Sequence, residues 1–107
     1  MNLKELGNRL EIGEEECREF LALFKKTALA ELTNLTQALK AQEVSSVERI
    51  AHSIKGAAAL LGLNEIHESA KRAERMAQMN RLDEIEADLQ IIRDGIAKIE
   101  EVLEGRS

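Results

Sequence analysis

The chain has 107 residues, of which 44% are hydrophobic and 33% charged, a balance typical of one folded domain rather than a disordered chain. Its net charge of −5 disfavours nucleic acid as the main partner, because a phosphate backbone is bound by a basic surface. Proline, tryptophan and tyrosine are absent from the sequence, so a β-rich fold is disfavoured and an all-helical fold is expected.

The first part of the chain predicts a short helix followed by a long one. Gly7 and Gly13 interrupt the N-terminal stretch, so residues 3–10 are expected to form at most a short helix. From Glu14 to about Gln42, apolar residues recur at steps of three and four, which predicts one long amphipathic helix. The residues expected on its apolar face are Cys17, Phe20, Phe24, Ala28, Leu32, Leu35 and Leu39.

A second amphipathic helix is predicted after a capping signal. Ser45 stands three residues before Glu48, which is the spacing of a capping box. Gly62 is placed where it would end this helix. The residues expected to face the core are Val47, Ile50, Ala51, Ile54, Ala58 and Leu61.

Two further helices are predicted in the remainder of the chain. The third is expected to begin near Asn64, with Ile66, Ala70, Ala73 and Ala77 on one side. Asn80 stands three residues before Asp83 and is expected to cap the fourth helix at its N-terminus. The apolar residues of that fourth helix alternate at steps of three and four: Leu82, Ile85, Leu89, Ile92, Ile96, Ile99 and Leu103.

These patterns predict the fold class. Four amphipathic helices joined by short turns cannot bury their apolar faces singly, so they are expected to pack around a common core. The expected fold is all-α: an antiparallel up-down-up-down four-helix bundle with a short N-terminal helical segment. Residues 1–107 are expected to form one domain of this kind.

Other residues limit the chemistry and the compartment. The single cysteine, Cys17, excludes an internal disulfide and a zinc site built from cysteines, and a buried position is expected for it. His67 lacks a partner ligand at helical spacing, so a half-exposed side chain is expected rather than a metal ligand. The longest apolar run is too short to span a bilayer, and the N-terminus lacks the layout of a secretion signal. A cytoplasmic location without a membrane partner is therefore expected.

One face of the second predicted helix is not explained by folding alone. At about 100° per residue, His52 points away from the core positions. Glu48 and Lys55 flank this outward face. Its other members are Ser45, Arg49, Gly56 and Ala59.

The small residues on this face favour contact with another protein. Solvent-facing helix positions usually carry long charged side chains, and a glycine within a helix costs about 1 kcal/mol relative to alanine. Gly56 and Ala59 would instead let a partner approach His52 closely. Lys55 reaches the same neighbourhood and would favour an anionic group bound to the imidazole.

A simpler interpretation exists for each of these residues. A single surface histidine is most often only a surface residue, and an exposed glycine is often tolerated without a role. The run of three alanines from Ala57 to Ala59 is also simply a good helix former. The combination of position, glycine and lysine favours a functional site, whereas periodicity alone does not separate the two interpretations.

The segment from His52 to Gly62 resembles a known signature. Its residues, His-Ser-Ile-Lys-Gly-Ala-Ala-Ala-Leu-Leu-Gly, are similar to the His-x-x-Lys-Gly-x-x-x-x-(apolar)-Gly motif of histidine phosphotransfer (HPt) domains in two-component phosphorelays. The motif covers 11 residues, and the helical pattern around it fits the whole chain. It looks most like HPt domains at the ends of hybrid sensor kinases. The alanines after Gly56 depart from many relatives, which carry serine or glycine there, and would reduce local hydrogen bonding to the phosphoryl group.

The resemblance implies a concrete function. His52 would accept a phosphoryl group on Nε2 from an aspartyl phosphate of one receiver domain and pass it to an aspartate of another. Lys55 would be the charge partner of the phosphoryl oxygens, and Gly56 would let the receiver approach. A neutral imidazole is a competent nucleophile, and phosphoryl transfer depends chiefly on positioning and charge neutralisation.

The same resemblance implies a phosphocarrier rather than an enzyme. Neither an ATP site nor autokinase activity is expected, and the sequence matches this in lacking a Gly-rich phosphate loop. No cofactor of its own is expected, and Mg²⁺ is expected in the partner receiver domain.

The expected partners are response-regulator receiver domains, with a hybrid sensor kinase as a further candidate. The residues expected to dock a receiver are Ser45, Glu48, Arg49, Ala59, Lys71, Arg72 and Arg75. For the three cations of the third helix, the alternative is an ordinary solvated face with Glu68 and Glu74 as ion-pair partners. A monomer is expected. The start at Met1 favours a one-domain protein, although a domain cut from a longer kinase would look the same.

Three other functions stay open. The phosphoacceptor domain of a chemotaxis-type histidine kinase shares the histidine and the Lys-Gly pair, but kinase domains normally follow it. The dimerisation domain of a sensor kinase usually has an acidic residue directly after its histidine and a proline soon after, whereas Ser53 follows His52 here and proline is absent from the sequence. The third is a structural helical adaptor without phosphotransfer, in which His52 is incidental.

Overall fold

The computed structural model describes residues 2–105, and all regular structure in that range is helical. The helices are α1 (Leu3–Leu10), α2 (Glu14–Lys40), α3 (Val44–Leu60), α4 (Asn64–Gln78), the short 3₁₀ helix η1 (Leu82–Glu84) and α5 (Glu86–Leu103). Within residues 2–105, no helix is both long enough and apolar enough to cross a membrane.

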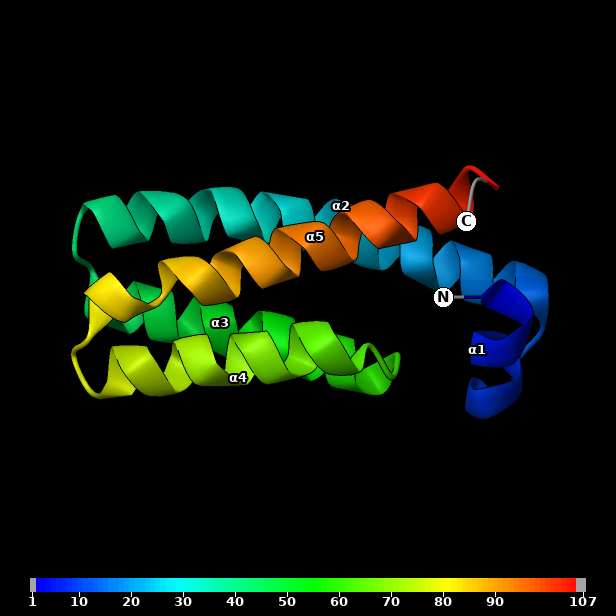
Figure 1. The fold of residues 1–107 in the computed structure, drawn as a ribbon, viewed down its shortest axis with the longest axis horizontal. Helices are drawn as coiled ribbons and strands as arrows, with labels where there is room; N and C mark the ends of the chain where they lie inside the picture. Colours follow the sequence, from blue (N-terminus) through cyan, green and yellow to red (C-terminus); the bar gives the residue numbers. More distant parts are fainter. Residues whose placement is uncertain (1, 106–107) are drawn as a thin grey trace.

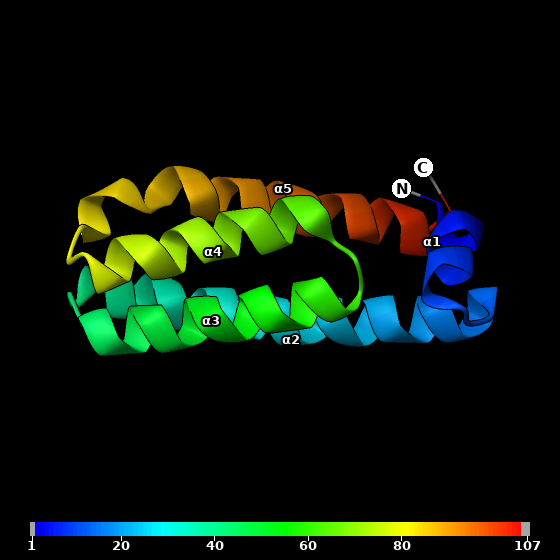
Figure 2. The same cartoon turned by 90° about the horizontal axis from the view of Figure 1, so that it is seen from below.

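The four long helices form a bundle. Following the colours of Figure 1 from blue to red, each of α2, α3, α4 and α5 runs in the direction opposite to the one before it. Each packs against its neighbours in sequence, and α2 also packs against α5, which closes the bundle (Figures 1 and 2). The predicted all-α bundle with a short N-terminal helical segment is therefore confirmed.

The core is made largely of the residues that the apolar pattern predicts. Cys17 is buried as expected, and burial raises the pKa of its thiol, with a further contribution from the nearby charge of Glu14. Phe20 is an exception, because its side chain is 47% exposed while Leu21 is fully buried. Phe20 lies at the edge of the α2 stripe, whereas Leu21, four residues after Cys17 and three before Phe24, lies within it.

The three connections between the long helices end the preceding helix in the same way. Gln42, Gly62 and Asn80 adopt left-handed φ angles of 56°, 68° and 58°. In the α3–α4 turn, the N–H of Leu63 donates to the carbonyl oxygen of Ala58 at 2.9 Å. This arrangement satisfies carbonyl groups at the helix end and favours glycine or asparagine at the left-handed position. Gly62 is confirmed as the end of the second long helix.

Two predicted N-terminal caps are wrong. Helix α3 begins at Val44, so Ser45 lies inside its first turn, and among the described residues no side chain caps this end. The reason is that Gln42 already closes the α2–α3 turn, and the next helix starts almost at once. Asn80 ends α4 instead of starting the next helix, and α5 follows only after η1. A polar residue in a tight turn can serve either helix, and the short spacing decides which one.

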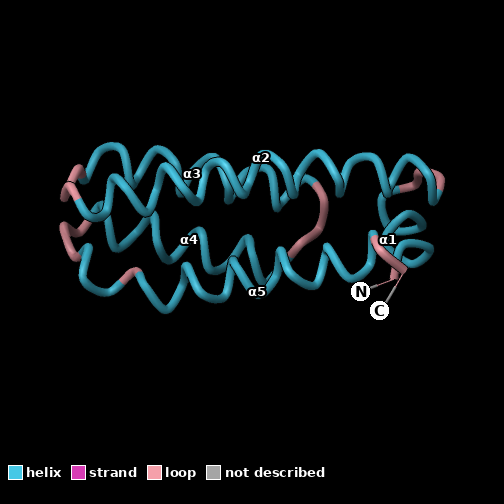
Figure 3. The backbone as a smooth tube through the Cα atoms, turned by 90° about the horizontal axis from the view of Figure 1, so that it is seen from above, coloured by secondary structure: helices cyan, strands magenta, loops and turns pink. Residues whose placement is uncertain are grey.

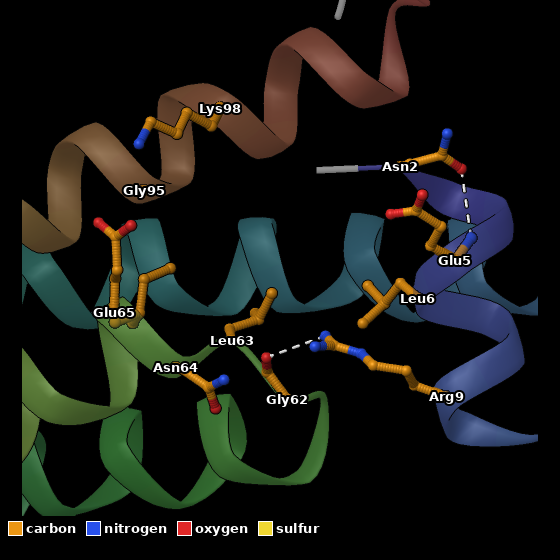
Figure 4. Close-up of a pocket in the computed structure, with 11 residues that line it drawn as sticks. Asn2, Glu5, Leu6, Arg9, Gly62, Leu63, Asn64, Glu65, Gly95 and Lys98 are labelled. Carbon is orange, nitrogen blue, oxygen red and sulfur yellow. Dashed lines mark hydrogen bonds between the residues drawn. The ribbon is translucent and has the colours of Figure 1, made fainter.

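Helix α1 packs across the end of the bundle. Figure 3 shows that the α3–α4 connection stops short of the end reached by α2 and α5, and α1 lies beyond it. The Asn2 side chain caps α1, and Arg9 Nη2 donates to the carbonyl oxygen of Gly62 at 3.3 Å (Figure 4). A cavity of about 350 Å³ lies between α1, the start of α4 and α5, and its lining includes neither His52 nor Lys55 (Figure 4).

Candidate functional site

His52 lies on the solvent side of α3, as the sequence predicts. Its side chain is 67% exposed, whereas Ala51 and Ile54 beside it are buried in the core. One turn later, a Cβ added to Gly56 would meet none of the described atoms within 4 Å. Ala59 is also exposed. The imidazole therefore stands on an open surface with small neighbours along its helix.

The carboxylate of Glu74 on α4 joins two of the predicted site residues. Its side chain is only 12% exposed. Its Oε2 lies 2.6 Å from Nδ1 of His52, and its Oε1 accepts a hydrogen bond from Nζ of Lys55 at 2.6 Å. Glu74 thus holds the imidazole and the ammonium group beside each other across the α3–α4 interface.

The close approach of α3 and α4 allows this contact. Helices α3 and α4 lie side by side (Figure 1), and their contact is the most extensive in the bundle. Because alanine side chains let two helix backbones come close, a carboxylate on α4 can reach polar groups on α3. The buried alanines of the two helices are Ala51, Ala58, Ala70, Ala73 and Ala77.

The charge state of Glu74 determines which ring nitrogen of His52 carries the proton. Burial by itself raises the pKa of Glu74, but the hydrogen bonds and charges of Lys55 and His52 outweigh burial, so the pKa lies below its ordinary value. An ionised carboxylate only accepts hydrogen bonds. Nδ1 of His52 must therefore carry a proton and donate it to Glu74. In the neutral ring, the lone pair is then left on Nε2.

Glu74 does not lie where the sequence predicts. The alternative of a solvated α4 face is wrong for Glu74 as a partner of the α4 cations, because its carboxylate is nearly buried and pairs with α3. A glutamate on a helix with charges on several sides gives no local sign of being buried. In the sequence, Glu74 is related to His52 only by a separation of 22 residues. This separation does not predict a contact, because it gains a structural meaning only when the helices are packed.

The predicted docking residues do not all lie together. Ser45, Arg49 and Ala59 are exposed on α3, and Lys71 and Arg75 are exposed on α4. Glu48 is half-buried, and its Oε1 accepts a hydrogen bond from Nε2 of Gln78 at 3.2 Å, across the same α3–α4 interface. The docking role of these residues stays a prediction.

Arg72 lies on another side of α4. Its Nε donates to Oδ1 of Asp88 on α5 at 2.8 Å, and its Nη2 donates to Oγ of Ser69 at 3.2 Å. Residues two apart on a helix are separated by about 200°, so Arg72 and Glu74 lie on nearly opposite edges of α4. Arg72 therefore faces α5, away from the His52 surface.

His67 is half-buried, close to the expected half-exposed position. Its Nδ1 lies 3.2 Å from the backbone carbonyl oxygen of Lys55, so it donates to this oxygen beside the site. Within residues 2–105, no group of three or more His, Cys, Asp or Glu side chains is arranged to hold a metal ion.

An apolar groove that the sequence did not predict lies between α2 and α3. Its volume is about 410 Å³, and Phe20, Leu23 and Leu60 line it. Leu60 is 81% exposed and directly follows Ala59 on the His52 surface. The available signal was that Leu23 and Leu60 are apolar residues outside the predicted core stripes.

Comparison with known proteins shows the family of this chain. A family model described as the Hpt domain matches residues 19–102, a range that contains His52, Lys55 and Glu74. Searches of curated proteins and of solved structures found no significant match. Hpt domains are phosphocarriers that interact with receiver domains and kinases. Because this family model matches most of the sequence, the chain belongs to the Hpt domain family, whose function is histidine phosphotransfer in two-component signalling.

Proposed function

We propose that this protein is a phosphorelay intermediate. It accepts a phosphoryl group on Nε2 of His52 from an aspartyl phosphate of one receiver domain and passes it to an aspartate of another receiver. The single observation that carries this proposal is the His52–Glu74 pair. An exposed imidazole that donates its Nδ1 proton to a buried carboxylate keeps a free lone pair on Nε2.

The transfer needs no proton to enter or leave the ring. The Nε2 lone pair attacks phosphorus in line with the P–O bond to the aspartate. The N–P bond forms as the P–O bond breaks, and the aspartate leaves as a carboxylate with the bonding electrons. The ring, still protonated on Nδ1, gains a positive charge that the carboxylate of Glu74 stabilises at 2.6 Å. In the second transfer, the carboxylate of the next receiver attacks phosphorus and the lone pair returns to Nε2.

Lys55 acts as the charge partner of the phosphoryl group in this proposal. Glu74 holds its Nζ next to the imidazole, so the ammonium group is already in place when a phosphorylated receiver docks. A divalent cation bound by the receiver supplies further charge neutralisation. This chain supplies the nucleophile, its protonation state and one positive charge.

The docking surface includes the small residues after His52 and the apolar groove beside them. Ala59 is exposed on the His52 face and Leu60 continues that surface into the groove. An exposed apolar groove is typical of a protein-binding surface. Its continuity with the reactive histidine favours a receiver domain as the occupant.

Replacing Leu60 by lysine should weaken receiver docking. Because Leu60 is 81% exposed, the free energy of unfolding should change by less than about 0.5 kcal/mol. Burying a leucine side chain contributes about 1.5–3 kcal/mol, so the KM for a phosphorylated receiver should rise about tenfold or more. Met79→Lys is the matched control, since Met79 is also exposed but lies after α4, at the opposite end of the α3–α4 pair. Equal KM values for the two variants would contradict the groove assignment.

Gly56→Arg separates docking from stability. Both Gly56→Ala and Gly56→Arg should stabilise α3 by about 1 kcal/mol, because glycine is a poor helix former and the site is open. Alanine should leave phosphotransfer nearly unchanged, whereas the long arginine side chain should block the receiver and slow the transfer at least about tenfold. Chemical denaturation and transfer kinetics measure the two effects. Equal transfer rates for both variants would rule out the need for an open surface.

The proposed function is tested directly by mixing the protein with phosphorylated receiver domains. The expected product is a labelled chain whose label is labile in acid and stable in base, as for a phosphoramidate. A second receiver added afterwards should remove the label. A chain that stays unlabelled with every phosphorylated receiver of its source would overturn the proposal.

A further inference from the structure

The α4–α5 interface contains a polar cluster at the edge of the apolar core, where the side chain of Arg72 is 54% exposed. Ser69 and Asp88 are buried, and both bind the guanidinium of Arg72, at 3.2 and 2.8 Å. Removing a carboxylate from water is costly, and apolar residues of similar size often stabilise a fold as well or better. Asp88 lies in the first turn of α5, where the helix dipole favours a carboxylate, but this does not account for its pairing with Arg72 on α4.

The core face of α4 defines its rotation only weakly. Near Glu74 the fully buried apolar residues of α4 are Ala70, Ala73 and Ala77, and Met76 is half-buried at the edge of the core. Single methyl groups form shallow ridges, so they permit a helix to turn about its axis more easily than larger side chains do. Ile66, the large buried apolar residue of α4, packs against Gly95 of α5 near the start of the helix, about two turns before Glu74.

Directional contacts hold α4 from opposite edges. Glu74 binds His52 and Lys55 on α3, and Arg72 binds Asp88 on α5. On the α3 side, His67 and Gln78 also donate hydrogen bonds to α3, to the carbonyl oxygen of Lys55 and to Glu48, whereas Arg72 holds the α5 side. A rotation of about 20° would move an atom about 6 Å from the helix axis by about 2 Å. Such a shift would break the 2.6 Å contacts of Glu74 with α3. The contact of Arg72 with α5 opposes this rotation from the other side.

We infer that Arg72 and Asp88 are positioning residues that fix the rotation of α4 and thereby keep Glu74 hydrogen-bonded to Nδ1 of His52. The expected effect of these two residues on the rate of phosphotransfer rests on the function proposed above. Their expected effect on which ring nitrogen of His52 carries the proton does not, because it can be measured on the protein without a partner. In this role Arg72 acts through α4 rather than by touching a receiver.

The test compares variants of the full chain. Asp88→Asn removes the charge with little change of shape, and the double variant Arg72→Met/Asp88→Leu replaces the pair by apolar side chains. Glu86→Gln is the matched control, because it removes one carboxylate from the same helix by breaking the exposed pair of Glu86 with Arg93. Nitrogen-15 chemical shifts of the His52 ring, measured where the ring is neutral, report which nitrogen carries the proton.

In the parent chain and in Glu86→Gln, we expect the proton on Nδ1 of His52. In Asp88→Asn and in the double variant, the ring should shift toward protonation on Nε2, and kcat for phosphoryl acceptance should fall about fivefold with the receiver KM unchanged. The double variant should show this loss even where its thermal midpoint is not lowered, which separates positioning from stability.

Variants that keep the parent ring shifts and kcat, and differ only in thermal midpoint, would overturn the inference and make the cluster purely structural. Failure of the proposed function is distinguishable from this result. It would appear as a parent chain that is never labelled, whereas the ring shifts of the variants would still decide the role of Arg72 and Asp88.

Discussion

Replacing His52 by glutamine should abolish phosphoryl acceptance, while the free energy of unfolding changes by less than about 0.5 kcal/mol. The imidazole is largely exposed, so its loss removes little packing. Glutamine also carries an amide N–H that can donate to the nearly buried carboxylate of Glu74, so this group keeps a partner in addition to Lys55. Label transfer from a phosphorylated receiver and chemical denaturation measure the two effects.

His67→Gln is the matched control, because it makes the same chemical change at the second histidine, whose ring contacts the backbone of Lys55. This variant should still be labelled. If His52→Gln were labelled at the parent rate, the assignment of the phosphoacceptor would be wrong. Labelling that disappeared only in His67→Gln would move the acceptor to α4.

Glu74→Gln should slow phosphoryl acceptance about ten- to hundredfold, because hydrogen bonds to charged groups contribute about 1.5–3 kcal/mol. A carboxylate can only accept, which forces the proton of His52 onto Nδ1, whereas an amide can either donate or accept. The amide also cannot neutralise the positive ring that forms on phosphorylation, and it leaves Lys55 without its charge partner. Single-turnover transfer from a phosphorylated receiver measures the effect.

Glu68→Gln is the matched control, since Glu68 is an exposed carboxylate on the same helix. Its transfer rate should equal that of the parent chain. Equal rates for Glu74→Gln and the parent would show that the carboxylate does not assist the reaction. The position of the proton on the His52 ring would then have no effect on phosphotransfer.

Glu74 also makes stability depend on pH. Its pKa is lower in the folded chain than in the unfolded chain, because the hydrogen bonds and charges of Lys55 and His52 outweigh the effect of burial. A lowered carboxyl pKa adds stability that is fully present above the ordinary carboxyl range and is lost as the pH falls through the folded value. The difference in unfolding free energy between the parent and Glu74→Gln should therefore shrink on acidification from neutral pH. Urea unfolding at a series of pH values measures it, and a difference independent of pH would contradict this linkage.

The amino-acid sequence by itself determined the helices, the bundle and the outward position of His52. These features depend on local periodicity, because an apolar residue every three or four positions defines a helix face whatever lies opposite it. The motif from His52 to Gly62 likewise lies within one helix and its end. Turn residues were less decisive: Ser45 and Asn80 have the side chains of N-caps, but the length of each turn placed one inside a helix and the other at a helix end.

The tertiary structure alone decided which charged residues meet at the site. Helix α4 carries charges around much of its circumference, so the sequence cannot tell which of them faces α3. Packing against α3 and α5 turned Glu74 toward His52 and Arg72 toward Asp88. These pairs are far apart in sequence, and their distances depend on how far each helix is rotated about its own axis. That rotation is a property of the packed bundle, which is why the carboxylate beside the reactive imidazole became visible only in the folded chain.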